Sequence, residues 1–459
     1  MLDPRIAAAP QSSGITVIIV GLGIAGLTTA ISCHLRGHTV IGFDKLENLE
    51  PYGGLGDGVT LAPNGTRVLR EFGNGTVAEW MERWALTCTN CKVFDTSGNH
   101  IGQHPIPETD RGLALVPRGK LVQTLYEVAQ ELGLDLRLGV KITEYYEDHE
   151  HASVVVDGTR FKGDCILFAD GANSKHRKIV STRNVELHQS GFSVYRGKVE
   201  GEVVKKDPKC HWLLSGEMEK DVAKAFSGPN MYLVLATCGS GKACFCIAMS
   251  QNTRPLENAW TTPIDKEEVL KRVRGWKLEH QIRPIIEHMS KDQLINTPLV
   301  RAGALDSWVS PTGRIALIGD AAHPFFPTSA QGASQAIEDG ATVAITLQLA
   351  GKRNIKLGLN AMMELRKHRA TYIQHNAWRV NDEWFRSDQE ERTGDKASPT
   401  PGVMDWIIDH CCQTYAWDEF DQVRECIETG IPYHPSNLPA ECYEKATNFL
   451  EQGGHGLPF

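Results

Sequence analysis

No apolar run in the sequence approaches the 18 or more residues of a membrane-spanning helix. A basic excess is missing as well, because 48 Lys and Arg stand against 56 Asp and Glu, and the formal net charge is −8. Nucleic acids and anionic membrane surfaces attract proteins that carry a basic face. We therefore expect no nucleic acid partner and no membrane span. The composition leaves the oligomeric state open.

Convincing metal-ligand spacing is also missing. Cys88 and Cys91 form one C-x-x-C, but no second pair of Cys or His stands nearby to complete four ligands, and we predict no metal site. The first 14 residues are rich in Ala, Pro and Ser and lack the apolar core of a signal peptide. We expect them to be a disordered lead-in, and the protein to be cytoplasmic with its 12 cysteines reduced.

The sequence does contain a βαβ unit, and further strands and helices of the same α/β pattern follow in separate parts of the chain. The 459 residues exceed what one hydrophobic core usually organises, so two or more packed domains are expected. Alternating strands between 191 and 251 predict a second, sheet-based domain. The expected elements are helices Ile24–Arg36, Pro63–Phe72, Arg118–Leu132 and Ala330–Leu349, strands Ile15–Val20, Thr39–Phe43, Asp135–Leu138, Lys141–Tyr146, Ser153–Val156, Cys165–Ala169, Phe192–Val199, Tyr232–Ala236, Ala243–Met249 and Arg314–Ile318, and mostly polar helix past Lys352 with an unassigned tail after Arg392.

The first motif with a chemical meaning is a G-x-G-x-x-G directly after the first strand. Gly21 permits a tight turn, Gly23 lets the backbone approach a pyrophosphate, and Gly26 allows close helix–strand packing. Asp44 closes the second strand, where an acid hydrogen-bonds a ribose hydroxyl. The motif predicts a dinucleotide and does not choose between NAD and FAD.

A second motif, Gly319-Asp320-Ala321-Ala322-His323-Pro324, follows a strand and precedes a long helix. Asp320 at the strand end is placed to accept hydrogen bonds from the sugar chain of a cofactor. The amides of Gln331, Gly332 and Ala333 open the helix, and their partial positive charge would stabilise an anionic reduced flavin. This pattern favours FAD.

A third motif, Asp170-Gly171-Ala172-Asn173-Ser174-Lys175-His176-Arg177, ends another strand. Together the three motifs resemble those of the flavin aromatic hydroxylases, the group that contains 4-hydroxybenzoate and salicylate hydroxylases. The stretch from Gly319 to Asp339 is similar to their second FAD motif, and Asp170 belongs to a motif associated with FAD and the pyridine nucleotide. Arg118 stands where the family has a flavin-contacting arginine. Ala330 departs from the family, which usually has glycine there; if a glycine-only angle is needed, the loop must shift.

The resemblance covers nearly the whole chain and implies the fold. We expect an α/β protein with a Rossmann-like FAD-binding domain, an inserted mixed β-sheet substrate domain and a helical C-terminal region. The expected division is 14–84, 116–188 and 299–352 for the FAD-binding domain, 85–115 and 189–298 for the substrate domain, and 353–459 for the helical region.

Several short stretches look like fungal secondary-metabolism FAD monooxygenases that oxidise indole alkaloids, among them Gly56-Asp57-Gly58 and the late Tyr433–Pro439. The resemblance implies FAD as cofactor, NADPH or NADH as co-substrate and O₂ as oxidant. Reduced flavin would form a C4a-hydroperoxide that hydroxylates or epoxidises an electron-rich aromatic small molecule. Gly58 is expected to contribute to cofactor binding.

Three residues are candidates for catalysis. Arg196, in Tyr195-Arg196-Gly197, matches an arginine that such fungal enzymes place over the flavin, where its donors would hold a developing oxyanion. Asp57 matches an acid of the indole-oxidising subgroup, where it would orient a substrate N–H or steer a rearrangement. Ala236 stands where many phenol hydroxylases carry tyrosine, and Tyr232 is the candidate substitute.

Two other classes of function compete with this prediction. A phenol or salicylate hydroxylase, or a flavin oxidase or dehydrogenase that inserts no oxygen, would share the cofactor motifs. A binding protein that keeps an FAD-like fold, as Rab GDP-dissociation inhibitors do, would differ in class. Retention of all three motifs disfavours the binding protein.

Overall fold

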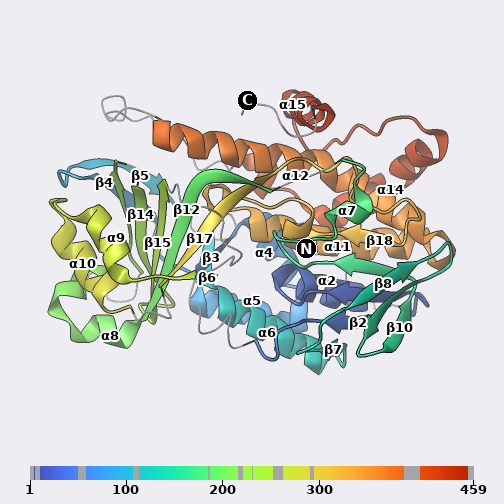
Figure 1. Ribbon diagram of the computed structural model, residues 1–459, viewed down its shortest axis with the longest axis horizontal. Coiled ribbons are helices and arrows are strands. Elements are labelled where there is room, and N and C mark those ends of the chain that lie inside the picture. The colour runs from blue at the N-terminus through green and yellow to red at the C-terminus, as the bar shows by residue number, and fades with distance from the viewer. Residues whose placement is uncertain are drawn as a thin grey trace.

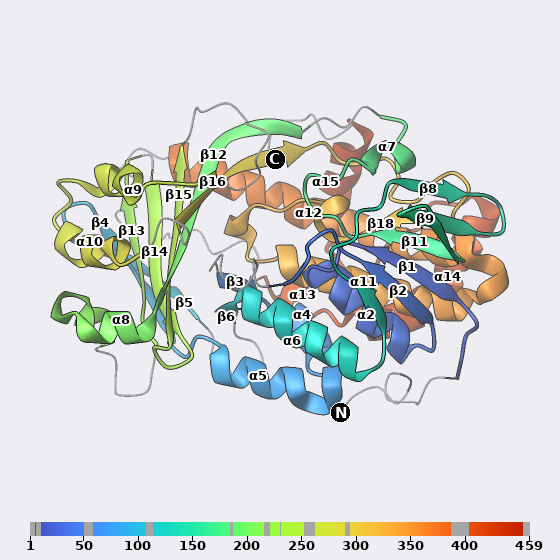
Figure 2. The same ribbon diagram turned by 60° about the horizontal axis from the view of Figure 1, so that its bottom comes forward.

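The computed structural model describes residues 5, 11–49, 58–106, 113–183, 187–214, 221–229, 231–251, 262–289, 294–386 and 404–452. An α/β part, which holds the N-terminal βαβ unit, lies beside a second part built on a large sheet (Figures 1 and 2). This arrangement confirms the predicted α/β class with a separate sheet. None of the described helices is long and apolar enough to cross a membrane.

The α/β part is centred on a parallel sheet of five strands. Its strands are buried on both faces, which explains their continuous apolar sequences. Neighbouring strands come from distant parts of the chain, since Val20 pairs with Phe168, and Phe168 with Leu317. The strand order is β18 (Ile315–Leu317), β11 (Cys165–Phe168), β1 (Thr16–Val20), β2 (Thr39–Phe43) and β7 (Asp135–Arg137).

Two small antiparallel sheets flank this core. One pairs β3 (Gly58–Leu61) with β6 (Ala114–Pro117). In the other, the expected strand Lys141–Tyr146 is wrong at its start: Val140 donates its amide to Asp44 O at 2.8 Å, so the chain reaches its own sheet only later. That sheet contains β10 (Thr159–Gly163), β9 (Ala152–Val156) and β8 (Glu144–Glu147).

The second part is a mixed sheet of eight strands. Tyr195, Leu233 and Cys244 point to its outer face, where they pack against helices α9 (Lys266–Val273) and α10 (Glu279–Glu287). The other face turns towards the α/β part. The order is β16 (Thr262–Pro263), β17 (Leu294–Ala302), β12 (Leu187–Glu200), β15 (Ala243–Gln251), β14 (Met231–Cys238), β13 (Ala223–Gly228), β4 (Asn90–Asp95) and β5 (His100–Pro105).

Helices cover the parallel sheet, and α11 (Gly332–Ala350) is the most deeply placed. It lies so close to α2 (Ile24–Leu35) that a Cβ on Gly340 would be 2.5 Å from Thr29 Oγ1. The other α-helices that precede α11 in the chain are α4 (Pro63–Leu69), α5 (Thr76–Trp84), α6 (Arg118–Glu131), α7 (Arg177–Val180) and α8 (Gly201–Lys206).

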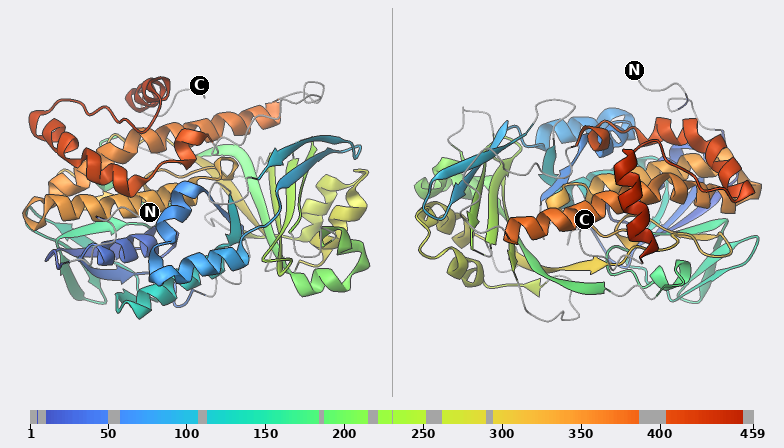
Figure 3. Two further views of the ribbon diagram at one scale, coloured as in Figure 1. Left: turned by 180° about the vertical axis from the view of Figure 1, so that it is seen from behind. Right: turned by 90° about the horizontal axis from the view of Figure 1, so that it is seen from above.

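The helix α12 (Ile355–Arg386) runs along the molecule and reaches the sheet part at its C-terminal end (Figures 1 and 3). The sequence of this helix is mostly polar, as predicted, but many of its polar side chains are buried. Arg366, Arg369 and Gln374 are all buried. Three further helices occupy the region left unassigned: α13 (Asp405–Ile408), α14 (Cys412–Thr429) and α15 (Ala440–Glu451).

Candidate functional site

The glycine turn after β1 has the geometry that a bound pyrophosphate requires. Gly21 adopts φ +98°, and a Cβ there would lie 2.6 Å from the Ala169 carbonyl oxygen. A Cβ on Gly26 would lie 1.8 Å from Gly21 O, so the helix packs directly on the turn. At Gly23, the N-cap of α2, a Cβ would meet nothing within 4 Å. The turn is therefore closed on its protein side and open at Gly23.

Asp44, directly after β2, braces this turn. Its carboxylate accepts the Leu22 amide at 2.6 Å through Oδ2 and the Leu46 amide at 2.9 Å through Oδ1. Sequence reasoning assigned Asp44 only to a ribose hydroxyl, which stays a prediction. A carboxylate can accept several hydrogen bonds, so the two roles are compatible.

Asp320 meets two arginines from distant segments at the end of β18. Burial raises the pKa of the Asp320 carboxyl, while the charges of His323, Arg118 and Arg177 oppose that rise. Arg118 begins α6 and Arg177 begins α7, and the Arg177 guanidinium donates to Asp320 O at 2.7 Å. Arg177 Nε is buried and has no partner among the described residues. An unused donor next to Asp320 fits a ligand rich in oxygen atoms.

Asp170 lies at the same edge of the sheet. It follows β11, and its Cα would be 3.1 Å from a Cβ built on Gly21. Asp170 Oδ2 is 2.9 Å from His176 Nδ1, and the His176 ring stacks on Phe168 with centroids 3.7 Å apart. The structure thus brings Gly21, Asp170 and Asp320 to the carboxyl ends of three neighbouring parallel strands, where ligands bind in open α/β sheets.

The start of α11 is held by a buried polar network that sequence reasoning missed. Asn64 Nδ2 donates to Gln331 Oε1 at 3.0 Å and to Glu338 Oε1 at 2.5 Å. Gln335 Nε2 donates to Gln331 Oε1 at 3.0 Å. Gln331 is the N-cap of the helix and Gly332 its first residue, so the network holds the segment whose amides are predicted to face the flavin.

Ala330 occupies the left-handed region, with φ +53° and ψ 19°. The loop therefore keeps a backbone angle that suits glycine, and the shift considered for an alanine at this position does not occur. Because a left-handed residue cannot lie inside an α-helix, α11 begins at Gly332 and not at Ala330.

Two buried arginines on α12 anchor this network. The Arg366 guanidinium pairs with Glu338 and donates through Nε to Asp339 Oδ1 at 2.9 Å. Burial alone would raise the pKa of Glu338, but the charges of Arg366 and Arg369 outweigh it and hold that pKa below its usual range. An acidic pair inside an otherwise apolar helix is the signal from which this cluster was predictable.

Arg196 and Tyr232 lie on the inner face of the eight-stranded sheet. Side chains alternate along a strand, and Tyr195 points to the outer helices, so Arg196 points inward. Register places Arg196 opposite Ile247 and Tyr232 opposite Met249. Arg196 donates to Thr297 Oγ1 at 2.8 Å.

This inner face contacts the second FAD motif. Val194, two residues before Arg196, belongs to a buried cluster with Met249 and Phe326, and Phe326 precedes the turn that leads into α11. The structure therefore brings Arg196 and the flavin motif to one interface, although 130 residues separate Arg196 from Phe326 in the sequence.

The Tyr232 hydroxyl has a partner that the sequence did not reveal. It lies 3.0 Å from His104 Nε2, and burial lowers the pKa of His104. Gly58, the first residue of β3, pairs with Pro117 beside Arg118. Asp57 lies outside the described residues, and its role stays a prediction.

Among the described residues, one group has the composition of a metal site. The ligand atoms of Asp207, Cys210 and His288 all lie within 4.8 Å of one another. The group is on the face of the large sheet that points away from the α/β part. The 2.9 Å contact between His288 Nε2 and Asp207 Oδ2 explains why these side chains lie close together. Burial raises the pKa of Cys88 to about 11 and of Cys91 to about 12, which disfavours thiolate chemistry at the C-x-x-C.

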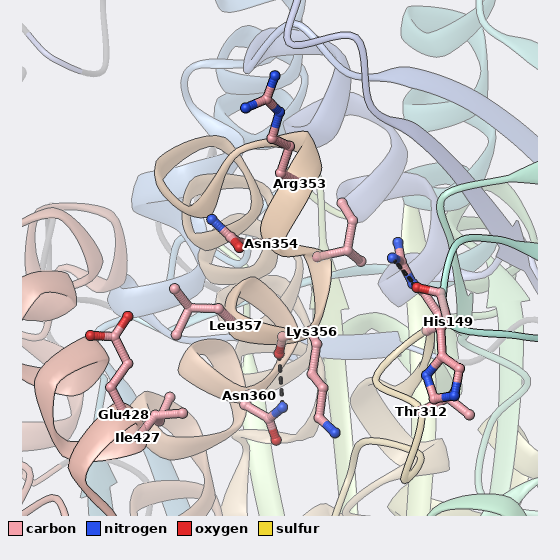
Figure 4. Close-up of a pocket in the computed structure, with 11 residues that line it drawn as sticks. His149, Thr312, Arg353, Asn354, Lys356, Leu357, Asn360, Ile427 and Glu428 are labelled. Carbon is pink, nitrogen blue, oxygen red and sulfur yellow. Dashed lines mark hydrogen bonds between the residues drawn. The ribbon is translucent and has the colours of Figure 1, made fainter.

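A cavity of about 410 Å³ lies at the N-terminal end of α12 (Figure 4). Lys356 and Asn360 of that helix and Arg353, just before it, line the cavity, with His149 on one side and Glu428 on the other. It contains none of the residues of the three cofactor motifs, and α12 runs from it towards the sheet (Figure 3). We do not assign the substrate to it.

The comparisons with known proteins agree with this geometry. Residues 14–371 match the family model described as FAD binding domain. The chain is 62% identical over 447 residues to the FAD-dependent monooxygenase opaC of Aspergillus ustus, with 96% of both chains covered. It is 38% identical over 445 residues to the asperlicin C monooxygenase of Petromyces alliaceus, which covers 96% of this chain and 95% of the relative.

A solved structure extends the agreement to three dimensions. CtdE in complex with FAD and its substrate 4 is similar to this chain with a TM-score of 0.84 at 32% identity, covering 90% of this chain and 100% of CtdE. The predicted family and aromatic-hydroxylase fold are confirmed. The chain belongs to the FAD-binding domain family, with fungal secondary-metabolism enzymes among its relatives, and is an FAD-dependent monooxygenase.

Proposed function

We propose that this monooxygenase consumes NADPH or NADH and hydroxylates or epoxidises an electron-rich aromatic small molecule, an indole alkaloid of fungal secondary metabolism. The observation that carries the proposal is the interface between the Arg196 face of the sheet and Phe326 of the second FAD motif. The name of the asperlicin C monooxygenase supports a substrate of this kind. One strand-linked G-x-G-x-x-G in the sequence means that NADPH would bind transiently over the flavin domain.

The residues of the chain fit FAD. The open face at Gly23 leaves room for a pyrophosphate, and Arg177 Nε offers an unused donor nearby. Bound FAD, once reduced, supplies the activated oxygen atom from O₂. The protein would orient the cofactor through Asp44, Arg118, Asp170 and Asp320, while Gly332 and Ala333 present amides at the start of α11.

Arg196 would hold the oxygen-bearing group or an oxyanion that develops on the substrate. Its guanidinium is fixed by Thr297 on the neighbouring strand, and a fixed donor costs little reorganisation during the reaction. Tyr232 would supply or receive a proton at the same face. The neutral form of His104, favoured by burial, is its relay partner.

Oxygen insertion is tested with ¹⁸O₂. Purified enzyme is screened for NADPH consumption stimulated by panels of indoles and phenols, and the products of active compounds are analysed by mass spectrometry. We expect an indole product that carries one ¹⁸O atom. Oxidised product without the label would identify a flavin oxidase or dehydrogenase, and activity confined to phenols would favour the phenol-hydroxylase alternative.

The role of Arg196 is tested by Arg196→Ala. We expect the variant to retain FAD and lose product formation by about 100-fold, the effect typical of removing an oxyanion donor. Arg272→Ala is the matched control, because Arg272 contacts Tyr195 Oη on the outer face of the same sheet. Turnover by Arg196→Ala equal to that of the control would remove Arg196 from the mechanism.

A further inference from the structure

Two polar side chains near the end of α12 are buried, and their polar atoms have no hydrogen-bond partner among the residues that the structure describes. Trp378 is 3% exposed and its Nε1 is unpaired, while Asn381 is 0% exposed and both Oδ1 and Nδ2 are unpaired. Residues three apart lie on the same face of a helix. By contrast, Gln374, one turn before Trp378, donates to Pro324 O at 2.9 Å.

The position of the pair relates it to the proposed reaction. Gln374 contacts Pro324 within the second FAD motif, and Asn381 lies seven residues further, roughly 10 Å along the helix axis. Trp378 packs in the buried cluster that joins Phe326 to Val194 of the large sheet. The pair therefore lies between the flavin motif and the sheet face that carries Arg196. On this stretch α12 passes from the α/β part to the large sheet (Figures 1 and 3).

Unpaired buried polar groups are rare in native proteins, because each destabilises the fold by the loss of its hydrogen bonds to water. A ligand that binds here would remove that cost if its own groups were complementary. Trp378 offers one donor, and Asn381 offers donors and an acceptor, with no charge on either side chain. The complementary group is neutral and presents a carbonyl together with an N–H, which describes a secondary amide.

We propose that Trp378 and Asn381 form a hydrogen-bonding subsite for a secondary amide on the aromatic substrate, so that Asn381 is a positioning residue for oxygen transfer. This inference rests on the proposed function for the identity of the substrate. It adds a recognition element at a distance from the ring that is oxidised. Binding energy from such a remote group orients the ring before reaction.

The subsite is tested by binding to the holoenzyme, followed through the perturbation of flavin absorption. The probe is N-acetyltryptophan methylamide, an indole with two secondary amides, and the comparison compound is 3-methylindole, which has none. We expect wild type to bind the amide probe at least tenfold more tightly. Asn381→Leu should lose that preference, and Trp378→Phe should reduce it, while both bind 3-methylindole as wild type does.

Asn360→Leu is the matched control, because it makes the same change on the same helix beside the cavity of Figure 4. Wild-type enzyme that does not prefer the amide probe overturns the subsite, and so does a preference that survives Asn381→Leu. The binding measurement needs no turnover. An intact amide preference with no ¹⁸O in any product would instead contradict the proposed function and leave the subsite standing.

Discussion

At the scale of single residues, the cofactor motifs combine positions that sequence reveals with positions it hides. The glycines of the first turn were predictable because each is required by a close backbone approach, as at Gly21 and Gly26. The bond from Asn64 to Glu338 was not, because 274 residues separate the two and no sequence pattern pairs them. Such a pair is recognised only when the fold brings it together.

Ala330 gives a direct prediction about stability. A left-handed backbone costs a residue with a Cβ roughly 1–2 kcal/mol, and glycine avoids that cost. We expect Ala330→Gly to raise the free energy of unfolding by about 1 kcal/mol, measured by urea denaturation, with FAD retained. Ala341→Gly, in the middle of α11, should lower it by at least a similar amount. A destabilised Ala330→Gly would show that the loop is not strained.

Asp320 gives a prediction about cofactor retention. Its carboxyl lies with Arg118 and Arg177 at the end of β18, where the sugar chain of FAD is expected. We expect Asp320→Ala to purify largely colourless, as judged by the ratio of flavin to protein absorbance. Asp306→Ala is the control, because that carboxylate bonds Thr182 at 2.6 Å outside the motifs. Full flavin occupancy in Asp320→Ala would refute the assignment.

At the scale of elements, most strands and helices followed from apolar periodicity, and the errors have local causes. The strand β8 starts late because Gly139 and Val140 bond the chain that follows β2. The inserted sheet was predicted from its alternating pattern. The contact between Tyr232 and His104 was not predicted, because β4 and β5, which belong to the same sheet, lie about 120 residues earlier in the sequence. Periodicity identifies a strand but not its neighbours.

The helix α12 gives a prediction about pH. Burial, helped by neighbouring cations (Lys367 for the first, Arg301 and Arg379 for the second), lowers the pKa of both His368 and His375 to about 4. Between the unfolded value near 6.5 and the folded value, the unfolded chain binds more protons. The contribution of these two histidines to the free energy of unfolding should therefore be complete above pH 6.5. It should decrease as the pH is lowered towards 4.

This dependence is measured by urea denaturation between pH 7.5 and 5. His368→Gln should reduce the slope by about 1 kcal/mol per pH unit, because one proton fewer is taken up on unfolding. His280→Gln is the matched control, because it makes the same change at an exposed position on α10. Equal slopes in wild type and His368→Gln would mean that folding does not lower the pKa of His368.

At the scale of the whole molecule, the FAD-binding core is assembled from three distant stretches of chain. Val17, Cys165 and Leu317 belong to one buried cluster, although they lie about 150 residues apart in succession. The motifs after β1, β11 and β18 made this assembly predictable, because a dinucleotide site needs all three strand ends at one edge of the sheet. The eight-stranded sheet has its own clusters of buried residues.

A ligand that binds only the folded state stabilises every segment whose opening destroys the site, by about 2.7 kcal/mol at 100 times Kd. Adding FAD to the apoprotein should therefore slow amide exchange in β1, β11 and β18 by one common factor, on the order of 100-fold. Amide exchange in strands β13 and β14 should slow less, because the eight-stranded sheet can open while the FAD-binding edge of the parallel sheet stays intact. In Asp320→Ala, FAD should not slow exchange in β1, β11 and β18 by a common factor. Protection confined to β1 would instead mean that FAD is held by the N-terminal βαβ unit alone, and that the long connection to β18 is not needed for the cofactor.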